Sequence, residues 1–379
     1  MKILFFSSYY YPYTSGITTY PDRLLSHLAR HHDITVLTFP HQRHLPATER
    51  RRGVTIVRMP YWLKISKGYV SPQALAYFFR FSRSSDLVIL NIPNGEGLFL
   101  ACCARLFGKK TVALFHCLVS PGQSWIFRIA TAFLNAMTFF QLWLSQLIVG
   151  YTADYVNHSW VGRRFPTKIR TVFPPVSTAA PRSRAGKRHP DRITIGYAGR
   201  IAREKGIEYL IEAIRLVKQV TTRPVTLELA GPYAGAVSGE MDYYRKIVNL
   251  LAKQRLDYRF LGNLSDKKLG AFYRSIDLLV LPSVNGTEAF GMVQVEAMLQ
   301  GTPVVATDLA GVRVPISLTK MGIVVPPQNP EALAEAITTV IDKRKRYTNQ
   351  RLITKARSIF NSDKTYRFYH RLLKTFSVN

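Results

Sequence analysis

Short apolar runs alternate with longer amphipathic stretches over most of the chain. Four to six apolar residues in a row predict a buried strand, whereas apolar residues three and four positions apart predict a helix with one buried face. In the first half, strands are predicted at Lys2–Phe6, Ile34–Phe39, Val54–Met59, Leu87–Asn91, Thr111–Phe115 and Leu147–Gly150. Helical stretches, such as Tyr20 to Arg30, lie between several of these strands. Strands that alternate with helices predict a parallel sheet covered on both faces.

The alternating pattern stops near Phe173 and starts again after residue 190. The stretch from 177 to 191 is polar, basic and contains prolines, which is typical of a linker. The second series predicts strands at Ile193–Tyr197, Thr226–Ala230, Tyr258–Leu261, Leu278–Leu281 and Val304–Ala306. It predicts helices at Gly206–Val220, Tyr243–Lys253, Asp266–Tyr273 and Pro330–Ile341.

A chain of 379 residues is too long for one ordinary core. We therefore predict an α/β fold of two Rossmann-like, doubly wound domains with a cleft between them, residues 1–180 and 181–362. The last stretch, residues 363–379, has an amphipathic helical pattern.

One apolar stretch departs from the alternation. Between Ser124 and Gly150 the only charged residue is Arg128. By length and hydropathy this stretch could span a membrane. However, polar residues such as Asn135 and Gln141 interrupt it, and a spanning helix would divide the predicted sheet. We interpret residues 124–150 as a core helix with an apolar side at a membrane surface, with a spanning helix as the alternative.

The net charge of +29 is spread over the chain. Residues 1–180 carry 20 Lys and Arg against 6 Asp and Glu, and the remainder carries 32 against 17. Such a field favours anionic partners: nucleotide phosphates, anionic lipids or nucleic acid. A basic proteome or simple solubility is the alternative explanation.

Three cysteines, Cys102, Cys103 and Cys117, do not form a disulfide framework and indicate a reducing compartment. The apolar start, Met1 to Phe6, is too short for a signal peptide.

The segment between the predicted strands Leu278–Leu281 and Val304–Ala306 carries two carboxylates, Glu288 and Glu296. If both were helical, they would lie about 80° apart around the axis and about 12 Å along it. They could then bind two separate hydroxyl-bearing groups of one extended ligand. Gly291 lets the backbone approach that ligand, and a helix that begins there offers unpaired N–H groups. A solvated helix face is the alternative.

This segment resembles the Glu-x7-Glu signature of the retaining GT-B glycosyltransferases of the family-4 (group 1) type, which include sucrose synthases and bacterial lipid mannosyltransferases. The resemblance implies that Glu288 faces the donor sugar and that Glu296 binds the ribose. It places Phe290, Gly291 and Met292 in the donor site. It also implies that the helix at 363–379 packs back onto the first domain.

The first strand of the second domain leads into Gly199-Arg-Ile-Ala-Arg-Glu-Lys-Gly206. Cations before a helix N-terminus suit a diphosphate, although such a cluster alone is often a solvated turn. The segment resembles the Gly-Arg-x4-Lys-Gly element of the same family, which implies that Arg200 and Lys205 bind the diphosphate. Leu261 corresponds to the family position beside the nucleobase, with an ordinary strand end as the alternative.

In the first domain, the stretch from Tyr9 to Thr18 contains Ser15-Gly16 where the family usually has two glycines. Only Gly16 is therefore expected to bring backbone against the donor phosphate. Tyr9 could stack on a ring of the acceptor or simply pack in the loop. His116 follows a Phe at a strand end, and in the family a histidine in this setting binds the donor sugar near the reaction centre. A satisfied core histidine is the alternative. We predict His116 and Glu288 as the catalytic residues.

The mechanism favoured for the family is a front-face retaining transfer, in which the leaving diphosphate takes the acceptor proton. The enzyme then mainly positions the reactants and stabilises charge, here through Arg200 and Lys205. The sequence has no Asp-x-Asp pair in a suitable loop and no His/Cys ligand cluster. We therefore expect no metal and no cofactor other than the nucleotide-sugar substrate.

We predict a glycosyltransferase that moves a sugar from a UDP- or GDP-linked donor to a lipid or lipid-linked glycan. We expect it at the cytoplasmic face of the plasma membrane. Basic and aromatic residues suit an anionic bilayer, and the residues expected there are Lys64, Lys67, Arg80, Arg83 and Trp125. A soluble acceptor, a sugar-nucleotide epimerase and a nucleic-acid-binding protein are the alternatives. No nucleic-acid partner is expected, because no aromatic-basic RNA-binding signature accompanies the charge.

Overall fold

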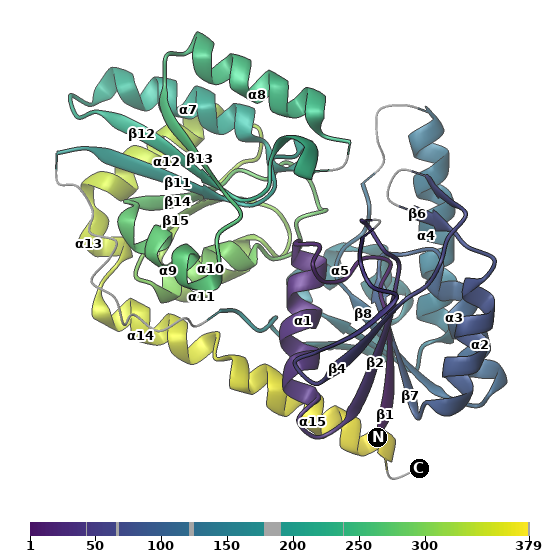
Figure 1. The fold of residues 1–379 in the computed structure, drawn as a ribbon. Coiled ribbons are helices and arrows are strands. Elements are labelled where there is room, and N and C mark those ends of the chain that lie inside the picture. The colour runs from purple at the N-terminus through teal and green to yellow at the C-terminus, as the bar shows by residue number, and fades with distance from the viewer. Residues whose placement is uncertain (43, 66–67, 121–124, 178–190, 238, 378–379) are drawn as a thin grey trace. The chain divides into compact units, whose positions relative to one another are not determined.

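The computed structural model describes residues 1–42, 44–65, 68–120, 125–177, 191–237 and 239–377. The chain divides into two compact units, which we call unit 1 (Met1–Pro175 with Ser362–Asn379) and unit 2 (Val176–Asn361). Each unit is a sheet with helices on both faces (Figure 1), so the predicted α/β, doubly wound fold is confirmed. The predicted domain boundary at 180/181 lies outside the described residues.

Unit 1 contains an 8-stranded sheet with the order β10-β9-β8-β7-β1-β2-β4-β3. Its strands are β1 (Lys2–Phe6), β2 (Asp33–Thr38), β3 (Thr48–Arg51), β4 (Val54–Arg58), β7 (Leu87–Ile92), β8 (Lys110–Phe115), β9 (Leu147–Gly150) and β10 (Ile169–Thr171). All neighbours are parallel except β3 and β4. A separate hairpin joins β5 (Leu63–Ile65) and β6 (Gly68–Val70). Every residue of β7 is buried, because helices cover both faces of the sheet centre.

On one face of this sheet lie α2 (Ala74–Ser84), α3 (Gly97–Leu106) and α4 (Trp125–Leu144), and on the other α1 (Gly16–Leu28) and α15 (Ser362–Ser377) (Figure 1). Short helices α5 (Ala153–His158), α6 (Trp160–Arg164) and η1 (Pro166–Lys168) precede β10. The hydroxyls of Tyr20 on α1 and Tyr369 on α15 are hydrogen-bonded at 2.6 Å, and both side chains are buried. The last helix of the chain is therefore an integral part of the unit that contains the first strand.

Unit 2 contains a 6-stranded parallel sheet with the order β13-β12-β11-β14-β15-β16. Its strands are β11 (Ile193–Ala198), β12 (Val225–Ala230), β13 (Asp257–Gly262), β14 (Leu278–Leu281), β15 (Val304–Thr307) and β16 (Gly322–Val325). Strands β11 and β14 are neighbours, and the strands that follow each of them extend the sheet in opposite directions. The strand order therefore reverses between β11 and β14. In open parallel sheets this switch point is where ligands bind, outside the carboxyl ends of the strands.

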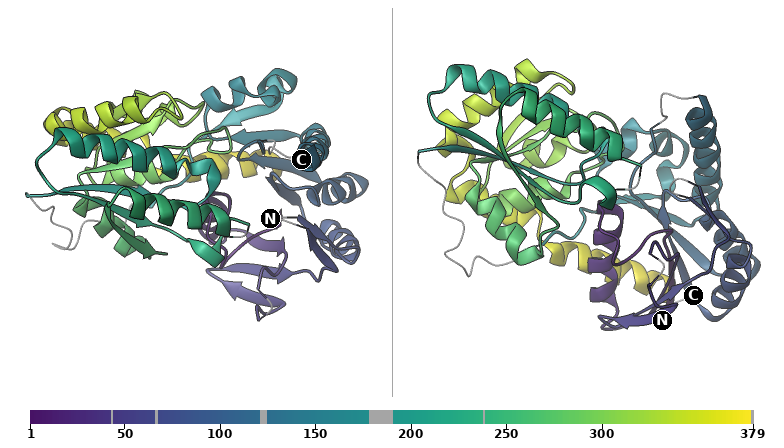
Figure 2. Two further views of the ribbon diagram at one scale, coloured as in Figure 1. Left: turned by 90° about the horizontal axis from the view of Figure 1, so that it is seen from above. Right: turned by 45° about the horizontal axis from the view of Figure 1, so that its top comes forward.

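The helices of unit 2 cover both faces of its sheet, as two views show (Figures 1 and 2). One layer contains α7 (Ile207–Val220), α8 (Met241–Lys253) and α12 (Pro330–Asp342), and the other contains α9 (Asp266–Ser275), α10 (Met292–Leu299) and α11 (Arg313–Thr319). The remaining elements are η2 (Arg203–Lys205), η3 (Ala234–Ala236), α13 (Arg344–Tyr347) and α14 (Gln350–Ile359). The stripe predicted for residues 207–217 is buried on α7, which explains the amphipathic pattern of that segment.

The apolar stretch at 124–150 forms α4 and then β9. Within the part of the chain that the structure describes, no helix combines the length and apolarity needed to cross a bilayer. The buried side chains of α4 are Thr131, Thr138, Gln141 and Leu142, near the middle and end of the helix. Many of its large apolar side chains are exposed instead.

Candidate functional site

The loop after β11 packs directly against the loop after β14, at the switch point of unit 2. Gly206 has a φ of +62°, and a Cβ atom there would lie 2.4 Å from the carbonyl oxygen of Pro282. The amide of Val284 donates to the carbonyl of Glu204 at 3.0 Å. Only glycine fits both the backbone conformation and the space at position 206. Two loops about eighty residues apart in sequence are therefore held together at one edge of the sheet.

This packing brings together two residues that the sequence predicted for the donor site. The ammonium of Lys205 contacts the carboxylate of Glu288, and the two side chains are 16% and 14% exposed. The second carboxylate oxygen of Glu288 accepts a hydrogen bond from the Gly291 amide at 3.0 Å. Arg200 contacts Glu204 at 2.7 Å in the same loop. Both predicted diphosphate ligands are thus half-buried cations with carboxylate partners, which an anionic ligand could replace.

Gly291 caps α10 in the left-handed conformation, with a φ of +72°. A Cβ atom at this position would lie 2.4 Å from a methyl of Leu281. Met292 follows as the first residue of α10, directly after the cap residue whose amide donates to Glu288. The ring of Phe290 is buried beside Phe360, so this residue has only its backbone to offer a ligand. The glycine is therefore required by the local geometry, and the approach of its backbone to a ligand stays a prediction.

Gln294 was not predicted, although it determines the shape of this loop. It is fully buried, and its side-chain amide donates to the carbonyl oxygens of Phe290 at 2.6 Å and Val312 at 2.9 Å. A glutamine among the apolar residues at the start of α10 is the signal in the sequence that could have indicated this role.

Glu296 lies on α10, where it is only 5% exposed. Its carboxylate accepts hydrogen bonds from the Tyr273 hydroxyl at 3.2 Å and from the Ser177 amide at 3.4 Å. The side chain of Ser177 donates in turn to Asp266 at 3.2 Å. The predicted ribose ligand is thus held in place by α9 and by the first residues of unit 2, and neither partner was predicted.

Aromatic side chains gather where β12 and β13 end. Tyr233 lies 4.9 Å from Phe260 and 5.6 Å from Tyr244, measured between ring centroids. Leu261, predicted beside the nucleobase, follows Phe260 at the end of β13 and is partly buried. The Gly231 amide donates to the Gly262 carbonyl at 2.9 Å, which joins the two strand ends. Tyr233 and Tyr244 were not predicted.

In unit 1, His116 closes β8 and is 1% exposed. The side-chain amide of Asn91 donates to Ser7 Oγ at 2.9 Å and to the carbonyl of Ile17 at 3.0 Å. The Asn91 oxygen therefore accepts from His116 Nε2, at 2.5 Å. Since Nε2 carries the proton, Nδ1 accepts the hydrogen bond from the Tyr151 hydroxyl.

Burial lowers the pKa of His116 to about 3, so the ring is neutral at neutral pH. Both ring nitrogens are engaged by residues of unit 1, and the network joins the carboxyl ends of β1, β7 and β8. This arrangement suits a neutral side chain that maintains the shape of the site. Direct contact between His116 and a donor sugar stays a prediction. Ser7, Asn91 and Tyr151 were not predicted.

The other residues predicted in unit 1 are those expected at the donor and acceptor, Gly16 and Tyr9, and those expected at the membrane. Gly16 is the exposed first residue of α1, while Tyr9 is buried in an aromatic cluster with Tyr13 and Tyr69. The residues predicted at the membrane are Lys64 on β5, Arg80 and Arg83 exposed on α2, and Trp125 at the start of α4. Lys67 lies outside the described residues.

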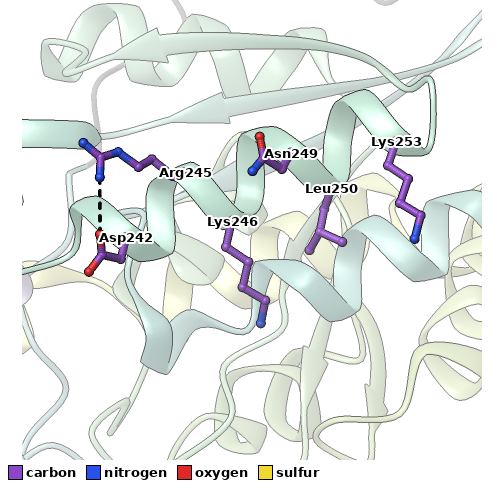
Figure 3. Close-up of a pocket in the computed structure, with 6 residues that line it drawn as sticks. All are labelled: Asp242, Arg245, Lys246, Asn249, Leu250 and Lys253. Carbon is purple, nitrogen blue, oxygen red and sulfur yellow. Dashed lines mark ion pairs between the residues drawn. The ribbon is translucent and has the colours of Figure 1, made fainter.

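Two further features complete the picture. Among the described residues, no three His, Cys, Asp or Glu side chains are arranged to hold a metal ion. A shallow depression of about 500 Å³ in unit 2 is lined by α8 alone, through Asp242, Arg245, Lys246, Asn249, Leu250 and Lys253 (Figure 3). Side chains from one helix cannot enclose a ligand, so this depression is not the candidate site.

Comparison with known proteins gives one family match and several relatives that match part of the chain. Residues 181–358 match the family described as "Glycosyl transferases group 1". A D-inositol 3-phosphate glycosyltransferase of Corynebacterium urealyticum is 32% identical over 144 residues, which are 38% of this chain and 33% of the relative. An uncharacterised glycosyltransferase of Methanocaldococcus jannaschii is 36% identical over 151 residues, 40% of this chain and 36% of the relative. These alignments span about a third of the length of each relative.

Solved structures match both units. Sucrose-phosphate synthase from Thermosynechococcus elongatus has a TM-score of 0.76 and 18% identity, covering 100% of both chains. Anabaena HepE in complex with UDP-glucose has a TM-score of 0.77 and 20% identity, covering 99% of this chain and 100% of that one. The chain therefore has the GT-B fold, and its residues 181–358 are similar to the glycosyl transferases group 1 family.

Proposed function

We propose that this protein is a retaining, metal-independent glycosyltransferase that moves a sugar from a UDP- or GDP-linked donor to a lipid or lipid-linked acceptor. The protein would act as a peripheral protein at the cytoplasmic face of the plasma membrane. The observation that carries the proposal is the contact between Lys205 and Glu288 at the switch point of unit 2. Cations and carboxylates at this place suit two adjoining parts of a nucleotide-sugar, the anionic diphosphate and the hydroxyl-rich sugar.

Donor binding would exchange partners at this contact. The diphosphate would take Lys205 and Arg200 from their carboxylates, together with the amides at the start of α10. Glu288, freed from Lys205, would then accept hydrogen bonds from the sugar. Glu296 would bind the ribose, held by Tyr273 and Ser177. The complex of HepE with UDP-glucose is consistent with this choice of donor class.

In the proposed reaction the bond between the anomeric carbon and the diphosphate oxygen breaks. The acceptor oxygen attacks the same face of the sugar, and its proton passes to the departing diphosphate oxygen. Such a reaction needs no side chain as general base, which agrees with a neutral and fully hydrogen-bonded His116. Catalysis would depend on the position of the reactants and on the cations that stabilise the developing negative charge.

A lipid acceptor is favoured by the exposed side chains of unit 1. We use the name apolar face for a set of exposed residues on the β5–β6 hairpin and α2 to α4: Trp62, Leu63, Ile65, Val70, Leu75, Phe79, Phe99, Leu106, Trp125, Ile126, Phe127, Ile129, Phe133, Phe140 and Trp143. The hairpin and α4 are joined through the loop before α3, since Glu96 accepts from the Tyr69 amide and a Cβ at Gly95 would lie 2.9 Å from Met137 Sδ.

The exposure of apolar side chains is clearest in the first turn of α4. Trp125 is 70% exposed, and every residue through Ala130 is exposed, so this turn is uncovered and is apolar apart from Arg128. In Figure 1 it extends beyond the carboxyl ends of the strands of unit 1. Apolar surfaces of this size on soluble domains usually mark contact with a membrane or a protein. Exposed Arg80, Arg83 and Arg105 on α2 and α3 add the cations that anionic lipids attract.

A soluble phosphorylated acceptor is the second candidate, because several relatives are named D-inositol 3-phosphate glycosyltransferases. Thermal-shift measurements with UDP-, GDP- and ADP-sugars would identify the donor, since a ligand that binds only the folded state raises Tm. With that donor, transfer to lipid extracts and to soluble sugar phosphates would be compared.

The membrane part of the proposal has its own experiment. We expect flotation with vesicles of phosphatidylcholine and phosphatidylglycerol, little flotation with phosphatidylcholine alone, and loss of both binding and lipid glycosylation in Phe127→Asp/Ile129→Asp. Val220→Asp is the matched control, because Val220 is an equally exposed apolar residue on unit 2. Full activity on a soluble acceptor without vesicle binding would contradict a lipid acceptor.

A further inference from the structure

The side chain of Lys64, on the β5–β6 hairpin, lies over two tyrosine rings. Its ammonium nitrogen is 5.5 Å from the ring centroid of Tyr9 and 5.6 Å from that of Tyr69. Both rings are buried, and they also pack on one another with centroids 5.4 Å apart. Aromatic faces attract a cation without neutralising it. The charge of Lys64 is therefore held in one place and stays available to an anion.

The carboxylates nearest to this cluster already have other partners. Glu96 accepts from Ser8 Oγ at 2.9 Å and from the Tyr69 amide at 2.8 Å. Glu49 contacts the guanidinium of Arg58. Within the described ranges, no acidic side chain forms an ion pair with Lys64. Lys64 thus has no direct ion-pair partner among the described residues, while the charge of Glu96 acts on Tyr9 and Tyr69 from nearby.

Arg58, which is paired with Glu49, and the neutral His41 lie in the same region. The Arg58 side chain is buried and donates to the carbonyl oxygens of Pro46 at 2.8 Å and Tyr11 at 3.0 Å. Burial, together with the charges of Arg58 and Lys64, lowers the pKa of His41 to about 4. His41 packs against Tyr13 with ring centroids 5.5 Å apart. Burial disfavours a charged imidazole here, and the charges of Arg58 and Lys64 disfavour it further.

The position in the fold indicates which ligand would supply the anion. Ser8 follows β1 and Glu96 follows β7, and the strand order of unit 1 reverses between these two strands. Their hydrogen bond therefore marks the ligand-binding edge of the unit-1 sheet. On the same hairpin as Lys64, Trp62 and Leu63 are exposed members of the apolar face. A ligand here would meet a cation at the sheet edge and apolar side chains immediately outside it.

We propose that Lys64, supported by Tyr9 and Tyr69, binds a phosphate group of the acceptor. This inference rests on the proposed function only in naming the ligand as the acceptor. An ammonium group is a compact charge that suits a phosphate oxygen. The phosphate could belong to a lipid-linked acceptor, whose chain would contact the apolar face, or to a soluble sugar phosphate.

Binding measurements without donor separate these sources. The probes are phosphatidylcholine vesicles that contain a polyprenyl phosphate, vesicles of equal charge that contain phosphatidylglycerol, and soluble glucose 6-phosphate. Lys64→Gln should weaken binding to one or both phosphate monoesters at least tenfold, and should change binding to phosphatidylglycerol vesicles less than twofold. Lys64→Arg should recover most of the affinity. Loss with the polyprenyl phosphate alone would identify a lipid source, and loss with glucose 6-phosphate a soluble one.

Lys253→Gln on α8 is the matched control, since Lys253 is an exposed lysine outside both candidate sites. Equal losses on phosphatidylglycerol and polyprenyl phosphate vesicles would overturn the proposal and make Lys64 a general membrane contact. The proposal would also be overturned if Lys64→Gln bound both phosphate monoesters as tightly as the wild type does. It would be overturned as well if the wild type bound neither of them. Sugar transfer from a nucleotide-sugar is assayed separately. Phosphate binding that depends on Lys64, in a protein with no transferase activity, would refute the proposed function and leave this inference intact.

Discussion

The switch points of the two units differ in the kind of side chain they contain. In unit 2, half-buried charges face one another: Lys205 with Glu288, and Arg200 with Glu204. In unit 1, a neutral histidine is buried among amide and hydroxyl groups of Asn91, Ser7 and Tyr151. The charged pairs can exchange partners for an anionic ligand, whereas the neutral network has a fixed set of donors and acceptors. The same strand arrangement therefore supports an adaptable site in one unit and a rigid one in the other.

The sharpest test of the adaptable site is Glu288→Ala. We expect transfer to fall by a hundredfold or more, about 2.7 kcal/mol, because the carboxylate acts on the sugar, while nucleotide binding stays nearly intact. Steady-state kinetics and nucleotide titrations provide the two measurements. Glu335→Ala, an exposed glutamate on α12, is the control. A Glu288→Ala enzyme with more than a tenth of the wild-type rate would contradict the assignment.

The loop contact beneath that site can be broken at Gly206. Gly206→Ala places a Cβ 2.4 Å from a backbone oxygen at a positive φ, so the loop must move. We expect a loss of at least about 2 kcal/mol in the free energy of unfolding, together with weaker nucleotide binding. Urea unfolding measures the first effect and thermal shift with nucleotide the second. Gly286→Ala is the control, because a Cβ there meets nothing within 4 Å. Equal effects from both substitutions would contradict the role of this contact.

The buried histidine of unit 1 should make the free energy of unfolding depend on pH. Burial lowers the pKa of His116 from 6.5 to about 3, so the folded state binds fewer protons than the unfolded state between these values. Stability is therefore full above pH 6.5 and falls as the pH decreases toward 3, by about 2 kcal/mol at pH 5. Urea unfolding of the wild type and of His116→Gln between pH 8 and 5 tests this. The variant should lose the part of the slope that comes from His116, while His41, whose pKa is also lowered, keeps its own part. An unchanged slope would show that His116 does not contribute.

A smaller effect is expected when Glu296, the predicted ribose ligand, loses the hydrogen bond from Tyr273. Tyr273→Phe removes the hydroxyl that donates to Glu296 at 3.2 Å. We expect nucleotide affinity to fall about fivefold, close to 1 kcal/mol, with little change in the rate at saturating donor. Isothermal titration with the nucleotide and KM measurements would show it, with Tyr347→Phe on α13 as the control. A fall in the saturated rate without a change in affinity would contradict this role.

The repeating pattern of the chain predicted the fold well because buried parallel strands are short apolar runs. The strands at Lys2–Phe6, Leu147–Gly150 and Leu278–Leu281 have the predicted bounds. In contrast, β16 (Gly322–Val325), which starts with glycine, was not predicted. The β5–β6 hairpin was missed because its apolar residues face outward, where no buried pattern forms.

The site was predictable only where one segment carries its own motif. Lys205 and Glu288 were predicted separately from two motifs, and the structure brings them together. The residues that support them were missed, because their partners lie far away in sequence. Asn91 contacts Ser7 across 84 residues, and Tyr151 contacts His116 across 35. No local pattern encodes such pairs, since only the strand order decides which loops meet.

The hydrogen bond between Tyr20 and Tyr369 has a consequence for folding during translation. These residues are 349 positions apart, so at 5 to 20 residues per second a ribosome needs roughly 17 to 70 s between them. Throughout that interval the first 175 residues lack the helix that covers α1. Unit 2 is continuous in sequence and can fold as soon as it emerges. The unit that is translated first is therefore the last to be completed, and its unfinished surface is the one a chaperone would meet.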